Sequence, residues 1–462
     1  MKAELQNYDI FPKVFLTGRE ETITVKPMGI HTGFSADEEY VILVKEVSRA
    51  EDKRFPGSGA VRTFRVRRAE DGCLRVSAVY EREGMYLIEI RKGSDDTKVT
   101  VLRVYALAHD MAGRYPYRGD LHMHTCRSDG REDPSVVAAN YRGHGYDFTV
   151  ISDHGRYYPS LEARAKFRSA GERGESDLTD LLIVQGEEVH LPLNAVHYVN
   201  FGGSFSINAL VDSTPNKEKA GADPAWRSLN GECPEVMTRE EFEAMIRERA
   251  KSVPRELESE RLSFAVAEWI HEMQQKAGGI GIFPHPYWLC TTMQLSEDYV
   301  EFFYRQHPFD VFEVLGGERY YQHNGFQTAF YYEMKAKGVE YPIVGSTDSH
   351  GSTENNVMAL VCSTIVFAPA NATPDLCDAI MKKYSVAVDS ISAEYRLVGD
   401  FRWVKYGSFL MEEWYPLHDL ACRAEGYFLK QFACGDENAE AVLLSMKGEV
   451  PRMMKKYFDI EE

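Results

Sequence analysis

Short apolar runs alternate with stretches of helical period across positions 115–390 of this 462-residue chain. Seven of these runs have the length of a β-strand, and they begin at positions 147, 181, 197, 279, 310, 341 and 385. Strands that alternate with helices predict βα units, which assemble into a parallel sheet or a barrel. The alternation therefore predicts an α/β fold for this central region.

Histidines and carboxylates stand where these predicted strands should begin or end. They are carried by His122-Met123-His124, Asp129, Ser152-Asp153-His154, Gly186-Glu187-Glu188, His197, His285-Pro286 and Asp348-Ser349-His350. A single histidine of this kind is more often structural than functional. However, the carboxyl ends of barrel strands meet on one face, where active sites lie. The set as a whole therefore predicts one shared site.

Metal ligation is the chemistry that this mixture of side chains favours. In a strand, residues i and i+2 point the same way, so the imidazoles of His122 and His124 can reach one ion. Imidazole nitrogens combined with carboxylate oxygens suit Zn, Mn or Fe. No cysteine belongs to the set, which argues against a structural zinc site.

The first 114 residues show a different pattern, in which short alternating segments follow one another without helical periods. These segments occupy 21–28, 40–47, 60–68, 73–80, 85–92 and 99–107. Asp71-Gly72 is typical of a hairpin turn. The pattern predicts an antiparallel β-sandwich. Because it lacks clustered chemistry, we interpret this domain as an accessory to the catalytic region.

The predicted organisation has three parts, which are 1–114, 115–390 and 391–462. An insertion over 203–278 interrupts the central part. Its first stretch, 204–235, is interpreted either as a lid over the site or as a surface excursion. The last part carries no motif, and we expect it to pack as an extension on the barrel or against another subunit.

The net charge and the cysteine pattern indicate which kinds of partner the protein can bind and in which cellular compartment it is expected. A formal charge of -18 disfavours a polyanion such as nucleic acid across the whole surface. No segment has the roughly 18 consecutive apolar residues of a membrane helix, and the N-terminus has no apolar core of the signal-peptide type. The 8 cysteines are scattered without a CxxC pair, as is typical of reduced thiols. We therefore expect a cytoplasmic protein that binds neither nucleic acid nor membrane.

The order and spacing of the motifs resemble the PHP (polymerase and histidinol phosphatase) domain over about 117–389. The hallmarks of that family are HxH followed by TxxSDG, then (S/T)DH, GxE with a later histidine, HP and DxH. The chain contains each of them, with Thr125-Cys126-Arg127-Ser128-Asp129-Gly130 directly after His124. A β-rich domain ahead of such a region is similar to the CehA/McbA-like branch of the family.

The resemblance implies a distorted (β/α)7 barrel that holds two or three divalent metal ions. One ion would be held by His122, His124, Glu188 and Asp348. A second would be held by Glu188, His197 and His285, and a third by Asp129, His154 and His350. Glu188 would bridge the first two ions. Since every motif has a match, the resemblance implies an active site.

Two of these assignments have a close competitor in the sequence. Glu187 competes with Glu188 for the bridging role, and the G-x-E spacing favours Glu188. His190 competes with His197 for the later ligand, and His197 is favoured because it precedes the run VNFG.

A hydrolytic mechanism follows from such ions. A water held between two divalent cations is deprotonated near neutral pH and becomes the nucleophile, while the cations hold the substrate oxygens. Arg127, Arg156 and Arg319 are candidate clamps for a phosphate group. Asp153 could orient a ligand, shuttle a proton, or only stabilise its own turn.

The sequence thus predicts a metal-dependent phosphoesterase that acts on a small phosphorylated molecule through a metal-activated hydroxide. Hydrolysis of an ester, amide or carbamate at the same site is one alternative, and a non-catalytic, metal-stabilised binding protein is another. A DNA exonuclease is disfavoured by the net charge and by the lack of any polymerase region. The β-rich domain could serve as the interface of a homo-oligomer.

Overall fold

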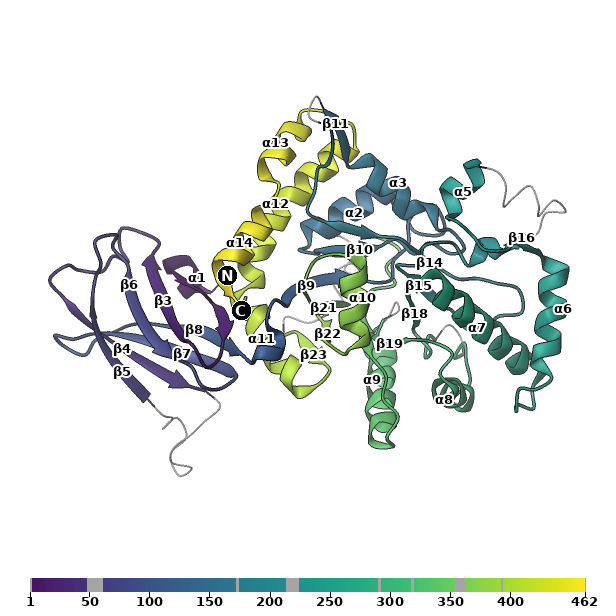
Figure 1. Ribbon diagram of the computed structural model, residues 1–462, viewed down its shortest axis with the longest axis horizontal. Coiled ribbons are helices and arrows are strands. Elements are labelled where there is room, and N and C mark those ends of the chain that lie inside the picture. Colours follow the sequence, from purple (N-terminus) through teal and green to yellow (C-terminus); the bar gives the residue numbers. More distant parts are fainter. Residues whose placement is uncertain are drawn as a thin grey trace. The chain divides into compact units, whose positions relative to one another are not determined.

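The chain forms two compact units in the computed structural model, which describes residues 2–47, 61–171, 174–212, 224–289, 292–316, 320–353, 362–391 and 394–461. Unit 1 comprises Met1–Tyr115, Phe401–Ala421 and Gly448–Glu462, and unit 2 comprises Pro116–Asp400 and Cys422–Lys447. The domain boundaries predicted from the sequence, at 114 and 390, stay a prediction. The compact units instead share the C-terminal segment between them. Figure 1 labels the elements of both units.

Unit 1 is built on two β-sheets. The smaller sheet has the order β1 (Tyr8–Phe11), β3 (Glu20–Pro27), β6 (Leu74–Val79). The larger sheet has the order β24 (Phe458–Asp459), β2 (Val14–Leu16), β8 (Lys98–Leu107), β7 (Gly84–Lys92), β4 (Glu39–Glu46), β5 (Val61–Arg67). Its helical segments are α1 (Ala3–Asn7), η1 (His109–Met111), α11 (Phe401–Glu413) and α14 (Glu449–Tyr457).

Alternating apolar residues from both sheets of unit 1 form one core. Ile23 and Val25 of β3 and Ile42 and Ile88 of the larger sheet are fully buried in it. The larger sheet is mixed rather than antiparallel throughout, because β2 pairs in parallel with both β8 and β24.

The turn predicted at Asp71-Gly72 forms, but it does not make a hairpin. Gly72 has a φ of 83°, and its N–H donates to the carbonyl of Ala69 at 3.0 Å. The strands that this turn joins, β5 and β6, belong to different sheets. The hairpin prediction is therefore wrong, since a tight turn can also carry the chain from one sheet to the other.

Glu21 in β3 makes the stability of unit 1 depend on pH. Burial, together with the nearby carboxylate of Asp459, raises the pKa of Glu21 to about 7. Because the folded pKa lies above the unfolded value, the folded state binds the proton more tightly and loses stability as the pH rises toward 7. We expect Glu21→Gln to gain about 1 kcal/mol relative to wild type between pH 5 and pH 8, a figure reduced for solvent screening. Urea unfolding at the two pH values measures this, and an unchanged difference would contradict it.

Unit 2 contains the central region and has two larger sheets. The first has the order β13 (Leu182–Val184), β10 (Phe148–Val150), β9 (Tyr115–Asp120), β21 (Cys362–Ala368), β22 (Ser385–Asp389), β23 (Arg396–Val398). The second has the order β14 (Gly186–Glu188), β15 (Val199–Phe201), β18 (Ile280–Phe283), β19 (Val311–Leu315), β20 (Ile343–Gly345). Two short pairs complete the unit: β11 (Arg168–Gly171) with β12 (Gly174–Asp177), and β16 (Val211–Asp212) with β17 (Met237–Thr238).

The α-helices in the described part of unit 2 lie between these strands or after the last of them in the chain. They are α2 (Pro134–Gly143), α3 (Tyr158–Lys166), α5 (Pro224–Asn230), α6 (Arg239–Ala250), α7 (Glu258–Ala277), α8 (Glu297–Gln306), α9 (Tyr320–Ala336), α10 (Thr373–Met381), α13 (Ala439–Met446) and most of α12 (Tyr415–Ala433). Helix α7 shows why its sequence folds this way. Leu262, Val266 and Ile270 recur at helical spacing and are buried, and Gly278, with a φ of 79°, ends the helix.

The mixed α/β architecture is confirmed, with a strand inside each of the seven predicted runs. A purely parallel arrangement is wrong, because β14, β15 and β18 pair antiparallel, as do β21, β22 and β23. No helix separates β14 from β15, and a parallel pair needs a crossover connection. In the described ranges the strand pairings form two open sheets rather than a closed ring. Within the same ranges, no helix is long and apolar enough to cross a membrane.

Candidate metal centre

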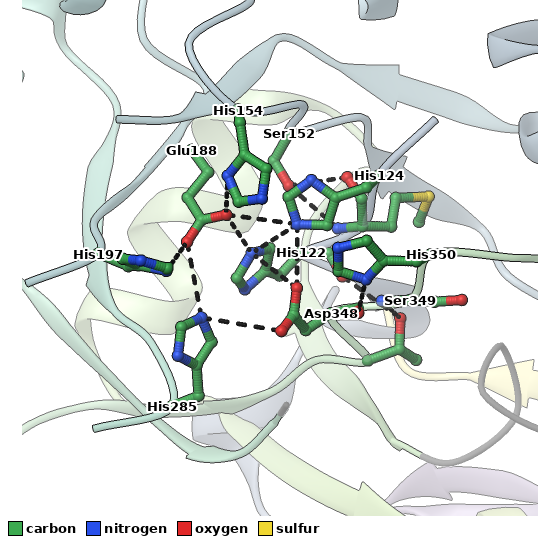
Figure 2. Close-up of polar contacts among 12 residues, drawn as sticks. His122, His124, Ser152, His154, Glu188, His197, His285, Asp348, Ser349 and His350 are labelled. Atoms are coloured by element: carbon green, nitrogen blue, oxygen red, sulfur yellow. Dashed lines mark hydrogen bonds and ion pairs between the residues drawn. The ribbon is translucent and has the colours of Figure 1, made fainter. Parts of the chain in front are cut away.

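The topology of unit 2 brings the ends of many strands to one place. His122, His154, His285 and Asp348 each lie a few residues after the end of a strand, namely β9, β10, β18 and β20. Since β9 and β10 pair in parallel, as do the three strands β18, β19 and β20, carboxyl ends gather at shared edges. Because β14 and β15 are antiparallel, His197 ahead of β15 lies near Glu188 at the end of β14. Figure 2 shows the side chains converging.

Glu188 lies at the middle of this cluster and is fully buried. Its Oε1 is 2.7 Å from His197 Nδ1 and 3.6 Å from His285 Nε2. Its Oε2 is 2.8 Å from His154 Nδ1 and 3.3 Å from the Nε2 atoms of both His122 and His124. Each carboxylate oxygen of Glu188 thus faces a different set of imidazoles.

Asp348 faces the His122-Met123-His124 segment from the other side. Its Oδ1 is 2.9 Å from His124 Nε2 and 3.4 Å from His122 Nε2, and the two Nε2 atoms are 3.3 Å apart. The structure therefore brings His122, His124, Glu188 and Asp348 into one buried group.

A more exposed group lies on the far side of the His124 ring. Asp129 Oδ2 is 3.4 Å from His154 Nε2 and 3.3 Å from His350 Nε2. The rings of His154 and His350 stack on that of His124 with centroids 4.3 and 4.4 Å away. The donor atoms of His124, Asp129, His154 and His350 all lie within 4.8 Å of one another.

The donor set fits divalent cations. Ligands at about 2.0–2.2 Å from a tetrahedral ion lie roughly 3.3–3.6 Å apart, close to the separations of these donors. Both oxygens of Glu188 and the Nδ1 atoms of His154 and His197 are buried without a hydrogen bond, although each nitrogen is within 2.8 Å of a carboxylate oxygen. Buried polar atoms that approach so closely without aligning for a hydrogen bond are oriented toward a common third partner.

The electrostatics of the cluster keep its carboxylates ionised. Burial alone would raise the pKa of Glu188, but His197 and His122 lower it to well below its usual range. Burial lowers the pKa of His122, yet Asp348 and Glu188 outweigh it, so the net shift is upward. Anionic carboxylates that face imidazole nitrogens provide negative charge where cations would bind.

Backbone strain accompanies two of these residues. His285 has a φ of 26° and Asp348 a φ of 52°, in the left-handed region that residues other than glycine rarely adopt. Such conformations cost about 1–3 kcal/mol each and cluster at functional sites. The fold therefore holds both side chains in the cluster at an energetic cost.

In each of the two pairs of competing residues, the two side chains lie in different surroundings. Glu187 points away from the histidines and accepts hydrogen bonds from Ser206 Oγ at 2.7 Å and Asn208 Nδ2 at 3.0 Å. His190 lies nearer the solvent, with its Nε2 3.8 Å from Glu188 Oε1, compared with 2.7 Å for His197 Nδ1. The geometry thus favours Glu188 and His197, and it places His190 beside the cluster as a further candidate.

Asp153 is fully buried and faces the loop that carries Asp129. It accepts hydrogen bonds from the backbone and side chain of Thr125 at 2.8 and 2.6 Å. It also accepts them from the backbone and side chain of Ser128 at 3.0 and 2.6 Å. Four donors occupy both oxygens, so the contacts favour a turn-stabilising role over a proton shuttle.

We expect Asp153→Ala to weaken metal binding at the Asp129–His154–His350 group by roughly 10–100-fold, the usual cost of removing a residue that holds ligands in place. The group built on Glu188 and Asp348 should keep its affinity, because Asp153 does not contact those residues. Competitive chelator titration of the full chain would separate the two classes of site. An equal loss in both classes would contradict this assignment.

The candidate phosphate clamps receive no support from the structure. The guanidinium of Arg127 is paired with both oxygens of Glu162 and, at 3.1 Å, with Asp133. Arg156 is exposed, and Arg319 lies outside the described residues. These contacts disfavour Arg127 as a phosphate clamp, because two carboxylates already hold its guanidinium, and the clamp roles stay predictions.

Two buried carboxylates beside the cluster were missed by the sequence analysis. Asp120 accepts hydrogen bonds from the backbone and side chain of Thr347 and from the His122 N–H. Glu313 contacts His122 and His285. Glu313 stands within the apolar strand β19, and a lone acidic residue in such a run is the signal that could have identified it, whereas Asp120 ends β9 two residues before His122.

Comparison with known proteins yields matches among solved structures only. No protein-family model matches the chain, and a search of curated proteins gives no match. One similar structure, from Bacteroides vulgatus, is a two-domain protein containing a predicted PHP-like metal-dependent phosphoesterase. It has 16% identity and a TM-score of 0.36, and the match covers 60% of this chain and 65% of that one, just under two thirds of its length.

Two further structures match over a similar share of this chain. A candidate metal-dependent phosphoesterase from Bifidobacterium adolescentis has 15% identity and a TM-score of 0.31, covering 52% of this chain and 89% of that one. An amidohydrolase from Chromobacterium violaceum, with bound sulfate and no metal, has 18% identity and a TM-score of 0.29, covering 50% and 87%. At these scores the likeness is too distant to assign an activity, which must come from the site itself.

Proposed function

We propose that this protein is a metal-dependent hydrolase that acts on a small molecule, with a phosphoric ester as the first candidate substrate. The observation that carries the proposal is the convergence of five histidines about Glu188 and Asp348. They are His122, His124, His154, His197 and His285. Structural zinc sites are closed four-ligand sites, whereas this cluster has enough donors for two or more ions.

The residues that would hold the ions fall into three groups. His122, His124, Glu188 and Asp348 form the first, Glu188, His197 and His285 the second, and Asp129, His154 and His350 the third. Bound divalent cations of the Zn, Mn or Fe type would polarise substrate oxygens and lower the pKa of a bound water. Glu188 would keep two groups together, and Asp153 would hold the Asp129 loop against the third.

We further propose that the two sheets of unit 2 correspond to the distorted (β/α)7 barrel, and the two sheets of unit 1 to the β-sandwich. The carboxyl-end placement of the donors supports the first assignment, because barrel active sites lie on that face. Core residues shared by both sheets support the second. A cytoplasmic location is also proposed, since the seven cysteines of the described segments are free thiols.

Hydrolysis of an ester, amide or carbamate is the second candidate, and one observation favours it. Arg127, expected to clamp a phosphate, is committed to Glu162 and Asp133. With Arg127 held in this way, a neutral acyl substrate places fewer demands on the pocket than a phosphate dianion does. A non-catalytic metal-binding protein is the third candidate, which the strained His285 and Asp348 backbones disfavour.

Elemental analysis of the purified chain beside His122→Ala and Asp348→Ala tests the proposal. We expect two to three ions of Zn, Mn or Fe per wild-type chain and fewer in both variants. The metal-loaded protein would then be screened on nitrophenyl phosphate, bis(nitrophenyl) phosphate, nitrophenyl acetate and an aryl carbamate. Turnover of the phosphates would support the phosphoesterase, and turnover of the acyl substrates alone would support the second candidate. A chain that binds no metal, with its fold unaffected by chelator, would overturn the hydrolase.

A further inference from the structure

Glu313 is a buried carboxylate beside the candidate metal ligands. It stands in the middle of β19, where Val311, Phe312, Val314 and Leu315 are all apolar, and it is fully buried. Its environment is closely packed: a Cβ at Gly316 would lie 1.9 Å from Glu313 Oε1. Burying an acidic group in an apolar strand is costly unless hydrogen bonds compensate for the lost hydration.

Two donors at Glu313 both belong to residues of the cluster. His122 Nδ1 is 3.2 Å from Glu313 Oε2, and the backbone N–H of His285 donates to Oε1 at 3.1 Å. One carboxylate therefore joins the group that contains His122 to the group that contains His285.

The contact with His122 fixes which ring nitrogen can bind a cation. A carboxylate oxygen accepts hydrogen bonds, so this contact favours the tautomer of His122 that carries the proton on Nδ1. The lone pair of Nε2 then faces Glu188 Oε2 at 3.3 Å and Asp348 Oδ1 at 3.4 Å. A histidine that ligates through one nitrogen and donates to a carboxylate through the other is held in orientation and made a stronger ligand.

The contact with His285 supports a strained backbone. His285 has a φ of 26°, and its ring extends to within 3.6 Å of Glu188 Oε1. The hydrogen bond from its N–H to Glu313 offsets part of the cost of that conformation. Without this bond, the segment after β18 could relax and move the ring away from Glu188.

We propose that Glu313 is a positioning residue that sets the His122 tautomer and the His285 backbone together, and so couples two of the cation groups. This inference rests on the proposed function. Glu313 does not face the cation groups itself and acts through the two histidines. Its substitution should change metal affinity through a tautomer effect, which a purely structural role would not produce.

The test compares Glu313→Gln with Glu313→Ala in the full chain, using Zn²⁺ and a competing chromophoric chelator. A Gln amide has one accepting oxygen and one donating nitrogen, so it cannot accept from both His122 Nδ1–H and the His285 N–H. We expect Glu313→Gln to lose roughly 10–100-fold in Zn²⁺ affinity, the range for residues that hold ligands. Glu313→Ala should bind Zn²⁺ at least as tightly as Glu313→Gln, although it should unfold at a lower temperature because it leaves a cavity.

The same strand region provides a matched control in Asp310. It precedes β19 and also accepts from a backbone N–H, that of Gly281 at 2.7 Å, and from an imidazole, His271 Nε2 at 3.1 Å, with Gln275 Nε2 as a further donor at 2.9 Å. None of these donors belongs to the cluster. Asp310→Asn should therefore lower the unfolding temperature but leave Zn²⁺ affinity within about threefold of wild type.

The outcomes separate this inference from the proposed function. A wild-type chain that binds no Zn²⁺ overturns both. Wild-type binding with unchanged affinity in Glu313→Gln, or with an equal loss in Asp310→Asn, overturns the inference alone. The inference would also be overturned if Glu313→Ala bound Zn²⁺ more weakly than Glu313→Gln and also unfolded at a lower temperature. That order is expected if Glu313 has only a structural role. The inference is supported if Zn²⁺ affinity falls only in the two Glu313 variants and Glu313→Gln binds Zn²⁺ no more tightly than Glu313→Ala.

Discussion

Replacing Glu188 by Gln is expected to release at least two metal ions per chain and to abolish measurable hydrolysis. Gln has nearly the same size as Glu but lacks its charge, so the fold should tolerate it. The carboxylate oxygens of Glu188 lie 2.7–3.6 Å from five imidazole nitrogens, so its removal affects every donor group that shares it. Removing a residue that only orients a metal ligand typically lowers metal affinity by roughly 10–100-fold. Because Glu188 would itself be a ligand, we expect a larger loss of metal affinity in Glu188→Gln.

The neighbouring glutamate is the natural control for this experiment. Glu187 is equally buried, but its oxygens accept from Ser206 and Asn208 and do not face the histidines. Glu187→Gln should keep its full metal content while losing some thermal stability. Metal analysis of both variants by mass spectrometry, with circular dichroism to verify folding, would decide between them. Equal metal loss in the two would remove Glu188 from the bridging role.

The second large effect is expected from Arg142, whose substitution should destabilise unit 2 by about 3–5 kcal/mol. Arg142 in α2 is fully buried. Its guanidinium lies 2.8 Å from Glu425 Oε2 in α12 and 3.3 Å from Asp147 Oδ1. Arg142→Met keeps the length of the side chain but leaves two buried carboxylates without their cation. Such a loss is a large part of the 5–15 kcal/mol by which domains are stable.

Two companion variants make the measurement specific to that network. Adding Glu425→Gln to Arg142→Met should recover part of the stability, because one of the uncompensated charges disappears. Arg305→Met, which removes an exposed pair with Glu301 at 2.7 Å, should change the free energy of unfolding by less than about 0.5 kcal/mol. Urea unfolding by circular dichroism gives all three values. A cost below about 1 kcal/mol for Arg142→Met would show that water reaches the network.

Local patterns predicted the strands of unit 2 because buried strands are short, apolar and bounded by turns. The same patterns could not predict whether neighbouring strands run parallel or antiparallel. The antiparallel pairing of β14 with β15 follows from their short connection, because a parallel pair needs a crossover. Strand β15 also pairs antiparallel with β18, although helices α5, α6 and α7 lie between them in the chain. The C-terminal strand β24 was also beyond prediction, since its pairing with β2 joins residues from opposite ends of the chain.

For the candidate site, the motifs located the side chains but not their roles. His122, Glu188 and Asp348 could be proposed from spacing, because strand ends meet at one edge. The role of Arg127 could not be read, since Glu162, which holds its guanidinium, lies in a helix with no motif of its own. Glu313 was missed for a related reason: its importance comes from two donors that only the tertiary structure brings to it.

The two open sheets of unit 2 meet where the donors are. Two isolated bridges, His154–Glu188 and Met123–Ser349, connect segments that follow the first sheet with segments of the second. His122 and His154 extend from the first sheet, and Glu188, His285 and Asp348 from the second. Ions bound between them would add cross-links to the few backbone hydrogen bonds that join the two sheets here, such as Glu188 N–H to Ser152 O at 2.9 Å and Asp348 N–H to His122 O at 2.8 Å. Chelation should then loosen the seam between the sheets, and hydrogen exchange in β10 and β14 would report this before the rest of the unit unfolds.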